Sequence, residues 1–109
     1  MKTVKKSIAT IGERLRTLRE DVHLSLREVA SHIGTDTSLL GKIERNERQP
    51  TKEQIKHIAE FFKIDEKILI KELLSDQFAY KIMEEEADID TLKVAEDKVE
   101  YLKTNHNAK

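Results

Sequence analysis

Residues 36–45 combine short hydrogen-bonding side chains with cations on a segment whose apolar residues are spaced as in a helix. Leu40 and Ile43 lie three residues apart and face one side of that helix, which leaves the other side free for a ligand. The residues expected on the free side are Asp36, Thr37, Ser38, Gly41, Lys42 and Arg45. Hydroxyls and cations in this arrangement can bond to base edges in the major groove of DNA. The pattern therefore predicts a helix that reads nucleic acid.

The preceding segment is predicted to be the helix that holds this one in place. Val29, Ala30 and Ile33 fall on one helical face, and Gly34 ends the helix. Ala30 is small where a second helix crosses closely, and Gly34 takes a positive φ angle without the clash of a Cβ. Two helices joined by so tight a bend form a helix-turn-helix.

Capping residues mark where further helices begin. Ser25 and Glu28 form an S-x-x-E capping box, in which each side chain bonds the backbone N–H of the other residue. Thr51 and Gln54 repeat this pattern, which predicts a fourth helix. The remaining starts are expected near Ser7 or Thr10 and at Asp65.

Apolar stripes on the first and fourth helices are expected to face one core. They consist of Ile11, Leu15, Leu18 and Val22 in the first helix and Ile55, Ile58, Ala59 and Phe62 in the fourth. The outer face of the first helix is expected to carry Arg14, Arg16 and Arg19. With 38% apolar and 5% aromatic residues, three Gly and one Pro in 109 residues, the chain is predicted to be all-α with one compact core.

The composition excludes several kinds of chemistry. The chain has no cysteine, which rules out disulfides, thiolate nucleophiles and sulfur-ligated metals. The four histidines lack metal-ligand spacing, and the glutamates at 84–86 point in different directions on a helix. No Gly-rich phosphate loop or catalytic serine signature is present, so we expect no enzymatic activity, no cofactor and no metal. No apolar run reaches the length of a membrane span, so we expect no membrane contact and a cytoplasmic protein.

Charge is distributed unevenly along the chain. Residues 1–63 hold 13 Lys and Arg against 9 Asp and Glu, a net charge of +4, and residues 64–109 carry a net charge of −5. A basic front half can contact phosphates while an acidic rear faces away from the duplex. The alternative is that this uneven distribution of charge arises by chance in a charge-rich helical protein.

Four segments carry a resemblance to a known family. They are IGERLRTLRE (11–20), LSLREVASHIG (24–34), LLGKIERNERQP (39–50) and IKHIAEFFKID (55–65). In their order and spacing, residues 8–74 resemble the DNA-binding domain of the Xre or Cro/CI family of bacterial and phage regulators. The resemblance implies a five-helix, lambda-repressor-like domain, a recognition helix at 36–45 and a dimer on a two-fold operator.

The resemblance also implies which side chains touch double-stranded DNA. Base contacts carry over to Thr37, Ser38, Gly41 and Lys42. Lys42 is the main candidate, because an ammonium can donate to O6 and N7 of guanine. Phosphate contacts are expected from Ser25, Arg27, Arg45, Asn46, Arg48 and Lys52.

Two positions depart from the family pattern. Leu26 stands where the family commonly has a glutamine that contacts the sugar-phosphate backbone, so either Arg27 takes over that contact or each half-site binds more weakly. Leu39, a position that is often polar in the family, contacts either a thymine methyl or the core. The assignment of contacts near the start of the second helix depends on which of the two alternatives holds at Leu26.

The segment after residue 74 carries apolar residues at helical spacing. The first set consists of Phe78 and Ile82, which are four residues apart, so the fifth helix is expected to run into the mid-eighties. Asp88 or Asp90 is then expected to cap a last helix. The second set begins at Leu92 and ends at Leu102, with the 3, 4 and 3 spacing of helices that pack side by side. A small closed domain cannot easily cover both sets, so we predict a homodimer contact, the alternative being a tail that folds back on its own domain. The residues concerned are Phe78, Ile82, Leu92, Ala95, Val99 and Leu102.

These features predict a DNA-binding domain at 8–74, a helical dimerisation extension at 75–103, and flexible ends at 1–7 and 104–109. The function expected is that of a sequence-specific transcriptional regulator, a repressor or autoregulator, which binds an inverted repeat as a homodimer. Phage-type repressors, antitoxins and controllers of restriction-modification systems all remain open. The alternative from another class is an adaptor or antitoxin-like module that holds a partner protein, with DNA binding secondary.

Overall fold

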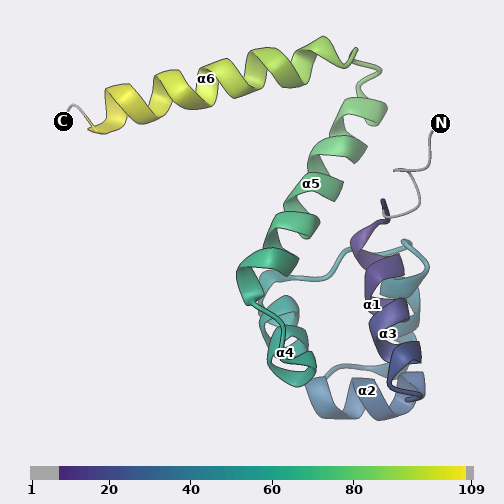
Figure 1. The fold of residues 1–109 in the computed structure, drawn as a ribbon. Coiled ribbons are helices and arrows are strands. Elements are labelled where there is room, and N and C mark those ends of the chain that lie inside the picture. Colours follow the sequence, from purple (N-terminus) through teal and green to yellow (C-terminus); the bar gives the residue numbers. More distant parts are fainter. Residues whose placement is uncertain (1–7, 108–109) are drawn as a thin grey trace. The chain divides into compact units, whose positions relative to one another are not determined.

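The computed structural model describes residues 8–107, and this part of the chain forms six helices and no strand (Figure 1). The helices are α1 (Ile11–Asp21), α2 (Leu26–Ile33), α3 (Thr37–Glu44), α4 (Lys52–Phe62), α5 (Glu66–Glu84) and α6 (Asp90–Asn107). The all-α class expected from the composition is confirmed. No helix in the described range is long and apolar enough to cross a membrane.

The chain divides into two compact units, the first ending at Asp76 within α5 and the second starting at Gln77. The described part of the first unit consists of α1 to α4 and the first part of α5, and the second unit holds the rest of α5 and α6. The flexible ends expected at 1–7 and 108–109 lie outside the described residues. Between 104 and 107, where the sequence also suggests a flexible tail, α6 continues as a helix to Asn107.

Side-chain caps fix the starts of four helices where the sequence predicts them. Thr10, Ser25 and Thr51 each form a capping box at the start of α1, α2 and α4. The carboxylate of Asp65 accepts a hydrogen bond of 2.9 Å from the backbone N–H of Lys67 at the start of α5. Each cap satisfies backbone donors that the first turn of a helix leaves unpaired. The alternative start at Ser7 lies outside the described residues.

The core of the first unit lies between its five helices. α1 packs against α3, and α2 packs against both α3 and α4. The buried apolar residues are Ile11, Leu15, Val29, Ala30, Ile33, Leu40, Ile43, Ile55, Ile58, Ala59, Leu69 and Leu73. Leu18 and Phe62 are partly buried against this core, so the inward stripes expected on α1 and α4 are largely present. Val22 is an exception, because it is the C-cap of α1 and is 50% exposed.

Two glycines shape this unit for different reasons. Gly34 ends α2 with φ +71°, the left-handed conformation that the sequence predicts at this bend. Gly12 is in α1 at its crossing with α3, where a Cβ would overlap the carbonyl oxygen of Ile43 and lie 2.7 Å from Oδ1 of Asn46. The two helices therefore approach closely enough that only a residue without a side chain fits at Gly12.

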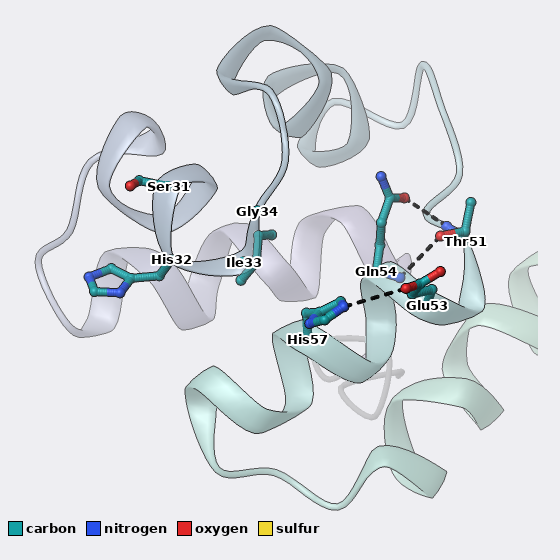
Figure 2. Close-up of a pocket in the computed structure, with 8 residues that line it drawn as sticks. All are labelled: Ser31, His32, Ile33, Gly34, Thr51, Glu53, Gln54 and His57. Carbon is teal, nitrogen blue, oxygen red and sulfur yellow. Dashed lines mark hydrogen bonds and ion pairs between the residues drawn. The ribbon is translucent and has the colours of Figure 1, made fainter.

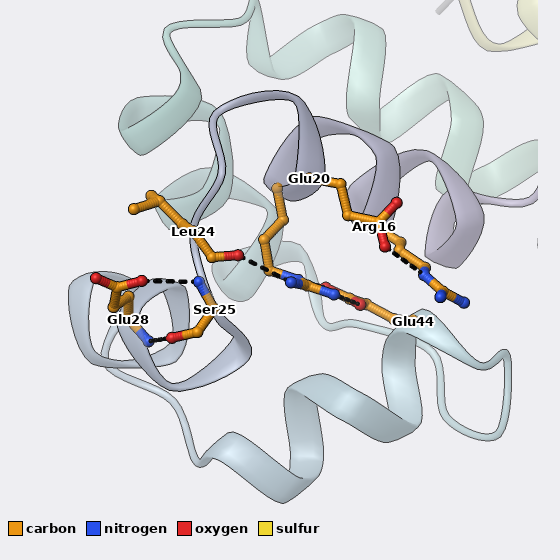
Figure 3. Close-up of polar contacts among 7 residues, drawn as sticks. Arg16, Glu20, Leu24, Ser25, Glu28 and Glu44 are labelled. Atoms are coloured by element: carbon orange, nitrogen blue, oxygen red, sulfur yellow. Dashed lines mark hydrogen bonds and ion pairs between the residues drawn. The ribbon is translucent and has the colours of Figure 1, made fainter.

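Arg19 corrects the expectation of an outward-facing α1 arginine. Its Nε and Nη2 donate to the two carboxylate oxygens of Glu44 on α3, at 2.8 and 2.9 Å, and its Nη1 donates to the carbonyl oxygen of Leu24 at 2.9 Å. Figure 3 shows these contacts beside the Ser25 capping box and the exposed pair of Arg16 and Glu20. The Glu44 side chain is 5% exposed and that of Arg19 is 13% exposed. The ion pair thus joins α1 to the end of α3 inside the protein.

The first part of α5 contacts the start of α1 through two polar pairs. The carboxylate of Asp76 accepts a hydrogen bond of 2.8 Å from the backbone N–H of Ile11. Arg14 Nη1 lies 3.4 Å from Oε2 of Glu72, one turn away along each helix. Burial is the main reason why the pKa of Asp76 is raised above its usual value, although the hydrogen bond from Ile11 acts in the opposite direction. These pairs fix the register of α5 against α1.

Candidate nucleic-acid interface

The exposed side of α3 carries three of the side chains predicted to contact bases. Leu40, Ile43 and Glu44 are buried on the opposite side of this helix. Because these three residues fix the rotation of α3 about its axis, the other face remains outside. The exposed side chains there are those of Thr37, Ser38 and Lys42. A hydroxyl can donate or accept a hydrogen bond, and an ammonium only donates.

Asp36 precedes α3 as its N-cap, with backbone φ −77° and ψ 138°, but its side chain forms no capping hydrogen bond. Its Oδ2 instead accepts a hydrogen bond of 2.7 Å from the hydroxyl of Ser38. The carboxylate therefore stands beside the first exposed turn of α3. Its negative charge is favourable at a helix N-terminus and unfavourable beside a DNA phosphate.

Gly41 is buried, although the sequence places it on the outer face. An added Cβ there would lie 3.1 Å from Nη1 of Arg45 and 3.8 Å from Cδ1 of Leu26. The guanidinium of Arg45 and the side chain of Leu26 therefore cover the backbone at Gly41. The space that a side chain would fill holds the end of the arginine.

Arg45, the C-cap of α3, forms an ion pair with Glu47. Nε of Arg45 lies 3.0 Å from Oε2 of Glu47, and Nη2 lies 3.4 Å from Oε1. The two side chains are 56% and 54% exposed. The hydrogen bonds to its partner raise the pKa of Arg45 and lower the pKa of Glu47, so both groups are charged near neutral pH. Sequence reasoning did not single out Glu47, although its place two residues after Arg45 in a turn is a local signal for such a pair.

Asn46 has a left-handed backbone with φ +66°. Its Oδ1 accepts a hydrogen bond of 2.6 Å from the hydroxyl of Thr10, which is also the N-cap of α1. The side-chain oxygen of Asn46 is therefore occupied, and its amide N–H groups are the part that a phosphate could use. No sequence signal links Thr10 to Asn46, because 36 residues separate them.

The other predicted phosphate contacts lie at the starts of α2 and α4 and in the loop between α3 and α4. Arg27, Arg48 and Lys52 are exposed. The hydroxyl oxygen of Ser25 accepts the backbone N–H of Glu28 at 3.0 Å, which leaves the hydroxyl hydrogen for a further acceptor. These three elements of the first unit thus present hydroxyl or cationic groups, which is the chemistry that phosphate recognition requires.

The two departures from the family pattern are both partly buried. Leu26 and Leu39 pack against the core of the first unit. Leu26 additionally covers Gly41 as described above. For Leu39, the core contact that the sequence offers as one alternative is present in the structure.

A polar hollow of about 570 Å³ lies between the end of α2 and the start of α4 (Figure 2). In Figure 2 the imidazole of His57 points toward Glu53, and these groups are 3.8 Å apart, while His32 points away from them. The His32 ring stacks on Phe61 with centroids 4.8 Å apart. Within residues 8–105, no group of three or more His, Asp or Glu side chains is arranged to hold a metal ion.

The residues predicted to form a dimer contact lie in the second unit. Between the end of α5 and α6 is a groove of about 360 Å³ whose surface is almost entirely apolar. Its lining includes Phe78, Ile82, Leu92, Ala95 and Val99. Leu102 does not line the groove and is 60% exposed. Five of the six predicted residues are therefore brought together at one surface.

One sequence family and several solved structures match part of this chain. Residues 12–74 match a family described as a helix-turn-helix domain. A search of curated protein sequences finds no match. Among solved structures, the chain is similar to the restriction-modification controller protein C.AhdI from Aeromonas hydrophila, with 34% identity and a TM-score of 0.51 over 54% of this chain and 89% of that one.

Two structures of SinR are also similar. The N-terminal DNA binding domain of SinR from Bacillus subtilis has 28% identity and a TM-score of 0.51, covering 55% of this chain and 88% of that chain. The SinR protein in its complex with the SinI protein covers 87% of this chain and 99% of its own, with 20% identity and a TM-score of 0.53. At that identity the second likeness concerns the fold alone.

Proposed function

The chain belongs to the helix-turn-helix family of DNA-binding regulators, of the Xre and Cro/CI type, and from this membership we propose that it represses transcription by occupying an operator as a homodimer. Autoregulation of its own operon is included in this proposal. In this proposal the protein acts in the cytoplasm, and it takes no catalytic part. The lambda-repressor-like fold agrees with this role.

The observation that carries the proposal is the exposed face of α3. Thr37, Ser38 and Lys42 are exposed there, while the buried side of the same helix is fixed by the core and by the Glu44 ion pair with Arg19. A helix held rigidly from behind can enter the major groove with little loss of conformational freedom. We infer that these three side chains contact base edges.

Phosphate contacts from the surrounding elements would fix the register of α3 on the duplex. The exposed cations Arg27, Arg48 and Lys52 supply the charge, and Ser25 and Asn46 supply neutral donors. Two of the similar proteins support this role by their descriptions, one as a controller of restriction-modification and one as a DNA binding domain.

We infer that the extension at 75–103 holds two copies of the DNA-binding domain at 8–74 together. The apolar groove of the second unit supports this, because exposed apolar surface of this kind favours association. Two recognition helices about 34 Å apart would read half-sites one helical turn apart on an inverted repeat. Two DNA-binding domains on one operator also raise the affinity, because binding of the first raises the effective concentration of the second at its half-site.

The competing function is an adaptor that holds a partner protein, with DNA contact secondary. The same groove favours it, because a partner protein could cover this apolar surface. The polar and cationic character of the exposed α3 face favours the DNA-binding regulator instead. An adaptor does not need such a surface.

Selection of bound sequences from a random DNA pool with the full chain tests the proposal. We expect an enriched inverted repeat whose half-site centres lie about 10 base pairs apart. Lys42→Ala should relax the preference at one position of each half-site. Arg48→Ala should weaken binding to all sequences and reduce the salt slope of the affinity by about 1.

Lys71→Ala provides the matched control, because Lys71 is an exposed lysine on α5 outside the proposed contacts. It should leave both the enriched sequence and the salt slope unchanged. A pool without any enriched sequence would reject the regulator in favour of the adaptor.

A further inference from the structure

Arg45 lies on the same face of α3 as the residues proposed to contact bases. It follows Ser38 by seven positions and Lys42 by three, and this spacing places side chains on one face of a helix. The C-cap backbone of Arg45, with φ −91° and ψ 7°, keeps close to the helical path. Its side chain therefore starts from the C-terminal end of the exposed face.

The guanidinium of Arg45 extends back along α3 toward its N-terminus. Its Nη1 stands 3.1 Å from the position that a Cβ on Gly41 would take, one turn earlier in the helix. Any side chain at Gly41 would compete with Arg45 for this space. The missing side chain at Gly41 thus allows the arginine to lie flat on the face that we propose enters the groove.

Glu47 fixes the plane of the guanidinium by binding one edge of it. The carboxylate accepts from Nε at 3.0 Å and from Nη2 at 3.4 Å. An arginine has five N–H donors, so both donors on Nη1 and one on Nη2 remain. These remaining donors form the end of the guanidinium, which is the edge that pairs with O6 and N7 of guanine.

Charge also distinguishes a guanine from a phosphate as the ligand of Arg45. A phosphate that approached the free end of Arg45 would come near the Glu47 carboxylate and be repelled by it. A guanine edge carries no net charge and offers two acceptors in one plane. The carboxylate therefore disfavours the phosphate contact that the family resemblance implies for Arg45.

The geometry points to Arg45 as a base-reading residue that binds guanine in the major groove, with Glu47 as its positioning residue and Gly41 as the space that admits it. This inference rests on the proposed DNA-binding function and replaces the phosphate contact assigned to Arg45. It adds one guanine to each half-site of the operator. It also assigns a role to Glu47, which the family resemblance does not name.

The test uses the full chain and the duplex that it selects from a random pool, together with the same duplex carrying A·T at the guanine position assigned to Arg45. The wild-type protein should prefer the first duplex by about tenfold or more. Arg45→Ala should remove this preference at one symmetric position per half-site. Arg45→Lys should weaken it, because lysine keeps the charge but has no planar fork that can bind Glu47 and guanine together.

Glu47→Gln distinguishes positioning from a purely structural role. It should reduce the guanine preference and increase affinity for an unrelated duplex, because a negative charge is lost. In the background of Arg45→Ala, the Glu47→Gln change should reduce the preference no further. Both side chains are more than half exposed, so unfolding curves of the variants should match that of the wild type.

The outcomes separate this inference from the function on which it rests. If the wild-type protein enriches no sequence, both are overturned. If a sequence is enriched, but Arg45→Ala weakens all duplexes equally and lowers the salt slope by about 1, then Arg45 is a phosphate contact and only this inference is overturned. An Arg45→Lys variant that keeps the full guanine preference would overturn this inference in the same way.

Discussion

Arg19 on α1 donates to both carboxylate oxygens of Glu44 on α3, through Nε at 2.8 Å and Nη2 at 2.9 Å, with the Glu44 side chain buried and that of Arg19 mostly buried. A buried carboxylate that loses such a partner keeps its desolvation cost without compensation. The pair raises the pKa of Arg19, chiefly through the hydrogen bond to Glu44. It thereby holds the end of the proposed recognition helix to α1.

Removing one member of this pair should destabilise the protein strongly. We expect Arg19→Met to lower the free energy of unfolding by about 3 kcal/mol or more, because Glu44 would remain as an unpaired buried charge. The double variant with Glu44→Leu should recover a large part of this loss. Urea unfolding followed by circular dichroism measures both changes.

The matched control for this prediction is Arg16→Met. Arg16 pairs with Glu20 at 3.0 Å on the same helix, but both side chains are more than half exposed. We expect a change of no more than about 0.5 kcal/mol, since exposed i,i+4 pairs contribute little. Equal effects of the two substitutions would contradict the importance of burial for the Arg19 pair.

The close crossing of α1 and α3 predicts a large effect of a single methyl group. Gly12→Ala should destabilise the protein by about 2 kcal/mol, because its Cβ would overlap the Ile43 carbonyl and the helices would have to separate. Gly34→Ala serves for comparison, since no atom lies within 4 Å of its added Cβ and only the positive φ is unfavourable. That change should cost about 1 kcal/mol, and Gly34→Asn less. Thermal unfolding gives the order, and a harmless Gly12→Ala would contradict the packing at the crossing.

The raised pKa of Asp76 predicts in which direction the free energy of unfolding changes with pH. Burial raises its pKa in the folded protein, so the folded state binds a proton at a higher pH than the unfolded chain does. The contribution of Asp76 to stability should therefore increase as the pH falls through its raised pKa, and level off below the unfolded value of about 3.9. In this window, the free energy of unfolding of the wild type should rise relative to that of Asp76→Asn. A relative fall would mean that the Ile11 hydrogen bond outweighs burial.

The apolar groove of the second unit predicts that a charge placed on its lining changes the oligomeric state. Val99→Lys places a charge on the lining of the apolar groove and should convert the proposed dimer into a monomer. Val94→Lys is the matched control, because Val94 is 44% exposed on the same helix but does not line the groove. Sedimentation equilibrium separates the two variants. A monomeric wild type, or a dimer that tolerates Val99→Lys but not Val94→Lys, would contradict the proposed contact.

The sequence was sufficient for features that depend on neighbouring residues. The capping boxes at Ser25 and Thr51 and the left-handed Gly34 follow from local hydrogen bonding and steric rules, and each is present. The buried stripes follow from helical periodicity in the same way. The end of α5 at Glu84 also agrees with the spacing of its apolar residues.

Features that depend on distant residues were missed. Arg19 and Glu44 are 25 residues apart, and nothing in the spacing of either reveals the other. The bond between Ile11 and Asp76 spans 65 residues, and it arises only once α5 has packed on the start of α1. The outward assignment of Arg19 was wrong for this reason, because a charged residue is expected outside unless its partner is known.

The hydrogen bond from Ser38 to Asp36 limits what Ser38 can recognise. Its hydroxyl hydrogen is already donated to the carboxylate at 2.7 Å, so only the oxygen lone pairs face outward. Such a group accepts from an amino group, which adenine and cytosine present in the major groove, and it has nothing to offer the carbonyl oxygens of guanine and thymine. The Asp36 carboxylate thus makes a hydroxyl that could donate or accept into a group that only accepts hydrogen bonds from DNA.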